Sequence, residues 1–584
     1  MTNSTEAQPF YRRLWFIMLA SGLLGGAIFL AIYGVRILDP TYDDWLLQGG
    51  DMTQHYIGWM YFRRSDWHFP IGMIDGLLGK IDISVMYTDS VPLLAIFFKL
   101  LSPILPETFQ YFGIMGLCAF ILDGACASLL IHRFNKNPLF CTLGSTIYVM
   151  CPAIFHRLYG HEALAFHYII LLGLILWVYQ DKRYKKRWQR ELIPPLLWGL
   201  LGMLAVGTHS YLLVMVCFFL LGAFVTDIVR HKNPSRPLFC LSSTILLSML
   251  MMWLIGGFAT TAPSSAEGLG VYSSNLNTFI NPHIDEGNGM VGYPAGGSIL
   301  LPSLAYNEGQ VKGYAYLGLG VMLGIVLCIV TLIVSAIRCE GGFFGNIRRA
   351  FTSRKVWTAA VAFVFAAAFL FALSPKCVLG HTTLYEISYP EKITNIMSSF
   401  RATGRFAWVC DYLIFTAVLY GLSRIKGRKL MIAALALCIA VQTVDLSVTF
   451  RSRRWYREKH EYVSPLSDPR WDLLTEGCDK FIALEYLQSP EQCYAFAVFA
   501  LKHDLKLYHF HVARPPMEAI IYQCADSLDA IQEGRADPTA LYVFIEEKYI
   551  PAKAKNLKIY EVDGLYVAKC PGQYDALAES EKAE

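Results

Sequence analysis

The sequence predicts an α-helical polytopic membrane protein with a C-terminal α/β domain outside the membrane. The 584 residues are 55% hydrophobic and only 16% charged, with a mean hydropathy of +0.40, whereas about a quarter of the residues of soluble domains are charged. Apolar runs long enough to span a bilayer recur up to residue 447. Charged residues become frequent again after residue 447, and no apolar run beyond that point is long enough to cross a membrane.

About eleven apolar runs approach or exceed the roughly 20 residues that a spanning helix needs. They are 14–34, 109–133, 138–155, 163–180, 192–209, 211–229, 237–258, 313–337, 356–374, 406–423 and 429–447. The first run follows Arg12 and Arg13 and lacks a small-x-small cleavage site. It is therefore predicted to be an uncleaved span rather than a signal peptide.

Basic residues predict which ends of the helices face the cytoplasm, because short basic loops stay inside. The segments 182–190 and 424–429 are strongly basic, whereas 259–312 holds Lys312 as its one basic residue. The pattern predicts a cytoplasmic N-terminus. An odd number of spans then places the C-terminus outside.

The multi-pass domain is predicted to cover residues 1–447, and its outer face carries three loops, at 35–108, 259–312 and 375–405. Loop 259–312 is rich in Gly, Ser, Pro and Asn, so it is predicted to be a flap that acts either as a binding lid or as a floppy connector.

Two short helical segments in the first outer loop, 51–62 and 91–101, are predicted to lie in the membrane interface. The first mixes aromatic and polar residues at helical spacing. The second is apolar but too short to span.

Residues 448–584 form the predicted outer α/β domain. Ala540–Glu546 is typical of a buried strand, and Asp563-Gly564 between two short β-type runs predicts a type I′ hairpin. Helices are expected near 489–504 and 516–533. Four cysteines of this domain either form one or two disulfides or remain thiols. They are Cys478, Cys493, Cys524 and Cys570.

The composition excludes several functional classes. The 50 basic residues nearly balance the 46 acidic residues, which gives no reason to expect a nucleic-acid partner. No Cys-x-x-Cys pair or Cys/His cluster is present, which argues against a zinc ribbon, a thioredoxin motif and haem attachment.

Two polar clusters combine acidic and histidine side chains. In the first outer loop, Asp51 and His55 would share one helix face, with Asp51 as the N-cap, near Asp44 and Gln54. Capping alone would explain Asp51. A carboxylate beside a membrane cavity could also accept a proton from a hydroxyl group or hold a divalent cation.

The second cluster contributes four further candidates for the lining of a polar cavity. They are His161, Glu162, His209 and Tyr211. Each could instead be an anchor at the membrane interface.

The third cluster is FRATGRFAW, which starts at Phe400. Arg401 and Arg405 stand four residues apart, so on a short helix they could grip a phosphate through paired hydrogen bonds. Snorkelling, or an ion pair with Asp411 or Glu391, is the structural alternative.

The layout resembles the GT-C superfamily of polytopic glycosyltransferases, which includes protein O-mannosyltransferases and lipid A aminoarabinose transferases. The segment from Thr88 is similar to the interfacial helix before the second span of that class. Four motifs resemble an uncharacterised family of bacterial multi-pass proteins placed near that class. They are GD-x-x-QHY at 50–56, W-x-FP-x-G at 67–72, GHE-x-L at 160–164 and FRA-x-GRF at 400–406.

The resemblance implies a bacterial inner-membrane enzyme that transfers a sugar from a polyprenyl-phosphate donor to a glycan, lipid or protein acceptor, with inversion. It assigns the role of base to Asp51, with Asp44 second, and phosphate binding to Arg401 and Arg405. The paired Asp-Glu motif typical of the mannosyltransferases is absent, and the role of a metal ion stays open. A transporter or flippase for a lipid-linked glycan and a non-catalytic envelope scaffold are the rival functions.

Overall fold

The computed structural model describes residues 9–180, 186–232, 234–259, 268–290, 293–338, 355–484, 489–551, 554, 557–570 and 572–578. Its contacts divide the chain into two compact units. We call Met1–Pro40, Tyr111–Met249 and Ser264–Lys459 the helical unit. We call Thr41–Gln110, Leu250–Pro263 and His460–Glu584 the composite unit. The first predicted outer loop and the C-terminal α/β domain, which we call the tail, therefore belong to the same unit.

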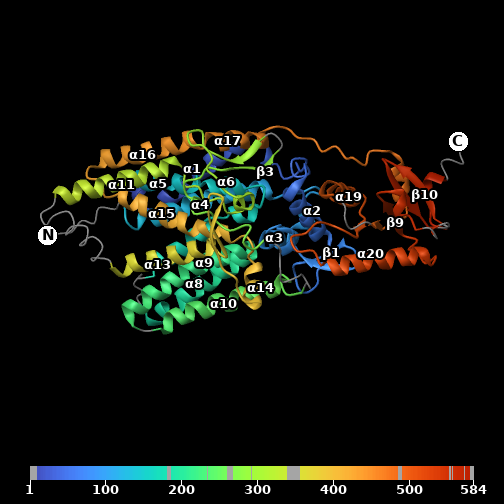
Figure 1. Ribbon diagram of the computed structural model, residues 1–584, viewed down its shortest axis with the longest axis horizontal. Helices are drawn as coiled ribbons and strands as arrows, with labels where there is room; N and C mark the ends of the chain where they lie inside the picture. The colour runs from blue at the N-terminus through green and yellow to red at the C-terminus, as the bar shows by residue number, and fades with distance from the viewer. Residues whose placement is uncertain are drawn as a thin grey trace. The chain divides into compact units, whose positions relative to one another are not determined.

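Most of the helical unit consists of apolar helices. The longer ones are α1 (Leu14–Tyr33), α4 (Phe112–His132), α5 (Pro138–Val149), α7 (Tyr168–Val178), α8 (Arg187–Thr208), α9 (Ser210–His231), α10 (Ser235–Leu254, which ends in the composite unit), α11 (Leu319–Arg338), α13 (Lys355–Ala372), α15 (Ala407–Leu422) and α16 (Arg428–Asp445). The shorter elements are α6 (Pro152–Arg157), α14 (Glu391–Ser398), α17 (Ser447–Ser452) and the hairpins β3 (Ile284–Met290)–β4 (Tyr293–Gly296) and β5 (Lys376–Leu379)–β6 (Thr382–Glu386). Helices α1, α4 and α5 pack against one another (Figure 1).

Each of the eleven predicted runs overlaps one of these long helices. By length and composition, eight described helices could cross a membrane, or nine if the bent pair Arg428–Asp445 and Ser447–Arg457 is one span. Two described apolar helices, Glu162–Val178 and Leu319–Ser335, are shorter. The set is compatible with a multi-pass membrane protein. The count of eleven spans stays a prediction, because the 11 residues of α7 rise only about 16 Å.

Glycines allow α1 and α4 to pack at close range. A Cβ atom built on Gly25 would lie 2.2 Å from the carbonyl oxygen of Phe120, and one on Gly124 would lie 2.3 Å from that of Ser21. Both distances are far below van der Waals contact, so only glycine fits these two positions.

The described part of loop 259–312 is packed by side-chain hydrogen bonds, which argues against a floppy connector. Asn275 donates from Nδ2 to Gln310 Oε1 (2.8 Å) and to the Gly380 carbonyl (2.9 Å). Asn281 accepts the Leu304 amide at 2.8 Å. The sequence has no periodic apolar pattern here, and hydrogen bonds of buried amide side chains hold the segment in place instead.

The composite unit combines two helices and a hairpin from the first loop with the tail. The loop elements are α2 (Gly50–Arg64), β1 (Met73–Leu78), β2 (Ile81–Ser84) and α3 (Pro92–Leu100). The tail elements are α18 (Arg470–Thr475), β7 (Lys480–Ala483), α19 (Pro490–Lys502), β8 (Lys506–Leu507), α20 (Met517–Gln532), β9 (Ala540–Phe544), β10 (Lys558–Val562) and β11 (Leu565–Lys569).

Hydrogen bonds join the loop elements to the tail inside the composite unit. The Tyr61 hydroxyl donates to the Leu505 carbonyl at 3.0 Å, and Gln523 Nε2 donates to the Leu78 carbonyl at 3.1 Å. Every residue of α2 from Met52 to Phe62 is buried. The prediction that this segment lies in the membrane interface is therefore wrong, because it has no free apolar face. Helix α3 does expose Phe97 and Leu100.

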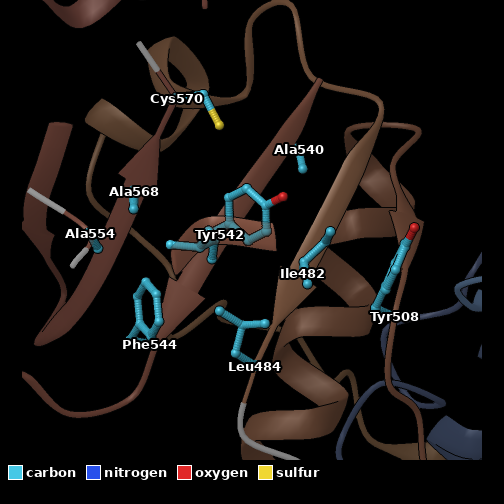
Figure 2. Packing of buried hydrophobic residues seen from close by; sticks show 10 residues of the cluster. Ile482, Leu484, Tyr508, Ala540, Tyr542, Phe544, Ala554, Ala568 and Cys570 are labelled. Atoms are coloured by element: carbon cyan, nitrogen blue, oxygen red, sulfur yellow. The ribbon is translucent and has the colours of Figure 1, made fainter. Parts of the chain in front are cut away.

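The tail folds as a five-stranded sheet in the order β10-β11-β9-β7-β8, with β7 parallel to β8 and β9. The predicted strand, hairpin and helices are confirmed, and Asp563 (φ 49°) and Gly564 (φ 73°) have the positive φ that a type I′ turn needs. Figure 2 shows apolar side chains of the sheet, among them Ile482 and Tyr542, gathered into one core. All four cysteines of the tail are free thiols.

His509 makes the tail sensitive to acid. Burial, with a smaller contribution from the charge of His511, lowers the pKa of His509 from 6.5 to about 4. Between those two pH values the unfolded chain binds a proton that the folded chain does not, so stability falls as the pH falls from 6.5 towards 4 and is fully present above 6.5. We expect a loss of about 2 kcal/mol in the free energy of unfolding.

The check is denaturant unfolding of the full chain in detergent, read by hydrogen exchange of the tail amides at several pH values. His509→Gln stays neutral throughout and should show a smaller loss than the wild type. Equal losses in the two proteins would contradict the assignment to His509.

Candidate functional site

Helix α2 carries three of the candidate residues of the composite unit. The helix begins at Gly50 with Gly49 as N-cap, so Asp51 is not the predicted cap but stands at the second helical position. Gly49 (φ 95°) and Gly50 (φ 73°) both have a positive φ, which glycine adopts without steric cost, and they form the turn that leads into the helix. Asp51 is half-buried, where the helix N-terminus favours its negative charge, whereas Gln54 is buried.

His55 faces a carboxylate that the sequence analysis did not single out. Its Nε2 lies 3.8 Å from Asp89 Oδ2, and His55 is 1% exposed. Asp89 has a φ of 54°, and the Ser90 hydroxyl beside it donates to the His55 carbonyl at 2.7 Å. Aspartate tolerates this left-handed conformation, so the turn-prone Asp-Ser before Val91-Pro92 was the signal for this position.

The neighbouring carboxylates are held by structural hydrogen bonds. Asp43 Oδ2 accepts from the Tyr56 hydroxyl at 2.7 Å, and burial raises the pKa of Asp43. Asp44 Oδ1 accepts the Tyr462 amide at 2.9 Å and so ties the first loop to the tail. Asp44, the second candidate base, thus already has a structural partner.

In the helical unit, Arg405 lies over an aromatic ring. It belongs to the 3₁₀ turn Thr403–Phe406, is only 8% exposed, and places its guanidinium carbon 4.9 Å from the centre of the Tyr211 ring. The Tyr211 hydroxyl accepts the Ala402 amide at 2.9 Å, and His209 Nδ1 accepts the Tyr211 amide at 3.2 Å. Arg405, Tyr211 and His209 therefore form one cluster.

Arg401 does not share a helix face with Arg405. It precedes the 3₁₀ turn, is exposed, and places its guanidinium carbon 5.6 Å from the centre of the Tyr272 ring. The helical spacing that would pair the two guanidinium groups is absent, because α15 begins only at Ala407.

Glu162 is fully buried after the 3₁₀ N-cap His161. The hydroxyls of Tyr111, Tyr159 and Tyr456 lie within electrostatic range of its carboxylate. At the point where the polar cavity is predicted, the structure therefore has a fully buried carboxylate with tyrosine side chains in its electrostatic surroundings.

Among the described residues of the composite unit, His68, Asp75 and Asp82 form a group that could hold a divalent cation. His68 Nε2 lies 2.9 Å from Asp75 Oδ1, and one oxygen of Asp82 lies with these atoms inside a 4.8 Å group. Burial and the nearby Asp75 raise the pKa of Asp82. A His and two Asp can ligate a hard or borderline cation.

The structure assembles the candidates into two sets that belong to different units. Asp44, Asp51, Gln54 and His55 lie in the composite unit, and His161, Glu162, His209, Tyr211, Arg401 and Arg405 lie in the helical unit.

Fold and site together define a class of helix-rich proteins with many apolar helices and a small C-terminal α/β domain. The chain belongs to the family described as a domain of unknown function (DUF6311), which matches residues 22–447. The DUF6311 C-terminal domain matches residues 470–571, which span α18 to β11. The search of curated proteins found no match.

Proposed function

We propose that the protein is a membrane glycosyltransferase that moves a sugar from a polyprenyl-phosphate donor to an acceptor outside the cytoplasm. The observation that carries the proposal is Asp51 in the N-terminal turn of α2, one turn before the buried His55, which faces Asp89. The N-terminus of a helix favours a negative charge, and a general base acts as its negatively charged carboxylate.

In this reaction Asp51 takes the proton of the acceptor hydroxyl. The hydroxyl oxygen attacks the anomeric carbon, and the bond from that carbon to the phosphate oxygen breaks, so the lipid phosphate leaves with the electron pair. Attack opposite to the leaving group inverts the configuration. Arg401 and Arg405 stabilise the charge that develops on the phosphate.

The arginines have different roles in this proposal. Arg405 is held by Tyr211 and supplies a fixed charge, whereas exposed Arg401 can close on the phosphate when the donor binds. Guanidinium groups suit this role because their paired N–H donors match two phosphate oxygens.

Native mass spectrometry of the full chain, purified in mild detergent from its host, tests the donor. The wild type should carry a polyprenyl-phosphate species, and Arg401→Gln should lose most of it. Arg428→Gln, an exposed arginine at the start of α16, is the matched control and should keep it. A wild type that carries only bulk phospholipid would contradict the proposal.

The proposal places the chain in a bacterial cytoplasmic membrane with the N-terminus inside and the tail outside. The unequal distribution of lysine and arginine between the loops supports this orientation. Proteolysis of intact spheroplasts should remove the tail. Protection of the tail until lysis would reverse the orientation.

A transporter for a lipid-linked glycan is the second candidate, and buried carboxylates favour it. Asp123 in α4 and Asp411 in α15 are fully buried, and neither has a hydrogen-bond partner among the described residues. Asp227, by contrast, pairs with Arg236 and His231. Translocation of a fluorescent lipid-linked sugar in vesicles, lost in Asp123→Asn, would favour transport over transfer.

A further inference from the structure

The helical unit contains a hollow of about 230 Å³ between its loops. Residues from loop 259–312 and from the β5–β6 hairpin line it. They are Leu269, Gly270, Val271, Asn307, Gly309, Gln310, Lys376 and Glu386. None of these residues belongs to the carboxylate and arginine clusters described above.

Asn275 connects the two segments that line the hollow by hydrogen bonds. Its Nδ2 donates to Gln310 Oε1 at 2.8 Å and to the Gly380 carbonyl at 2.9 Å, and its Oδ1 accepts the Gly380 amide at 3.1 Å. One buried side chain thus fastens the two lining segments, so the hollow is built before a ligand arrives.

Gln310 leaves a hydrogen-bond donor unused. The residue is 3% exposed, and its Oε1 accepts both from Asn275 and from the Asn307 amide at 3.0 Å. Its Nε2 has no partner among the described residues. A buried amide without a partner costs free energy, which a ligand oxygen that reaches this amide would recover, and Gln310 is one of the residues that line the hollow.

The charged lining residues restrict the chemistry of the ligand. Lys376 and Glu386 are direct cross-strand partners in the β5–β6 hairpin, and both line the hollow. Glu386 disfavours an anion and Lys376 disfavours a metal cation, whereas a hydroxyl group can accept from the ammonium and donate to the carboxylate. Leu269 and Val271 add an apolar surface.

We infer that this hollow is a binding site for a single sugar ring. A ring offers several hydroxyl groups that both donate and accept, together with C–H faces for the apolar lining. Pockets for drug-sized ligands measure about 300–1,000 Å³, so a hollow of about 230 Å³ takes a smaller ligand.

The inference goes beyond the proposed function, because a protein can bind a sugar ring without transferring it. One link does rest on that function. The Arg401 guanidinium lies above the ring of Tyr272, so the arginine assigned to the lipid phosphate contacts the residue that follows the lining residue Val271 in the chain.

Saturation-transfer NMR on the full chain in nanodiscs tests the inference, with the methyl glycosides of glucose, mannose and N-acetylglucosamine as probes. The wild type should transfer saturation to at least one glycoside. Gln310→Glu keeps the oxygen that accepts from Asn275 and Asn307 but removes the donor, so the signal should fall at least about tenfold. Lys376→Met, on β5, should also reduce it.

Gln492→Glu is the matched control, because Gln492 is likewise the third residue of a helix whose capping box it completes, but it lies in α19 of the composite unit. It should leave the signal unchanged. The inference is overturned if no glycoside receives saturation or if Gln310→Glu matches Gln492→Glu. A wild type that binds a glycoside but carries no polyprenyl phosphate would overturn the proposed function and keep this inference.

Discussion

Asp51→Asn should abolish sugar transfer and leave the protein folded. An amide cannot take the proton of the acceptor hydroxyl, so the rate should fall by about 10²–10⁴-fold, the range that a general base contributes. The substitution keeps the size of a half-buried side chain, so the packing of α2 should survive. The measurement is transfer of labelled sugar from polyprenyl-phosphate donors in membranes that contain each variant.

Asp472→Asn is the matched control for this substitution. Asp472 also lies in the first turn of a helix of the composite unit, but its side chain is 79% exposed, and its Oδ1 lies 3.6 Å from His503 Nε2. It should transfer at the wild-type rate. If Asp51→Asn retains full activity, Asp51 is not the base, and a loss in Asp44→Asn alone would assign that role to Asp44.

Gly25→Leu should prevent the helical unit from folding. The Cβ alone would lie 2.2 Å from the Phe120 carbonyl oxygen, which belongs to the α4 backbone and cannot move aside as a flexible side chain would. Separating α1 from α4 would open the helix pair on which α5 also packs. We expect a loss of at least about 3 kcal/mol and little monodisperse protein on size-exclusion chromatography in detergent.

Ala27→Leu supplies the control, because it adds the same side chain to the same helix at an exposed position. It should give wild-type yield and the same elution volume. A folded, monodisperse Gly25→Leu protein would contradict the close packing of α1 and α4.

Local patterns predicted the elements of the fold well. Asp563-Gly564 between two alternating runs forms the expected hairpin, because both residues tolerate positive φ whatever the rest of the chain does. Each apolar run overlaps a helix, and helix formation also depends on residues that are close together in the chain. Loop 259–312 was harder, since its order comes from amides such as Asn275, which leave no periodic signal.

The candidate site was predicted in part. Asp51 and His55 do lie on one helix, because a spacing of four residues acts locally. Asp89 was missed because its proximity to His55 depends on a turn 34 residues away in the chain. Arg401 and Arg405 were expected on one helix, but the backbone there is held by the Thr403 hydroxyl on the Ser374 carbonyl at 2.7 Å.

The sequence by itself determined the apolar helices, the tail sheet and the polar clusters, because these depend on composition and on residues a few positions apart. Only the tertiary structure decided that the first loop and the tail form one unit. Its bonds, such as that of Tyr61 to Leu505, join residues 444 positions apart. Such contacts follow from how side chains pack together, and a local pattern does not record them.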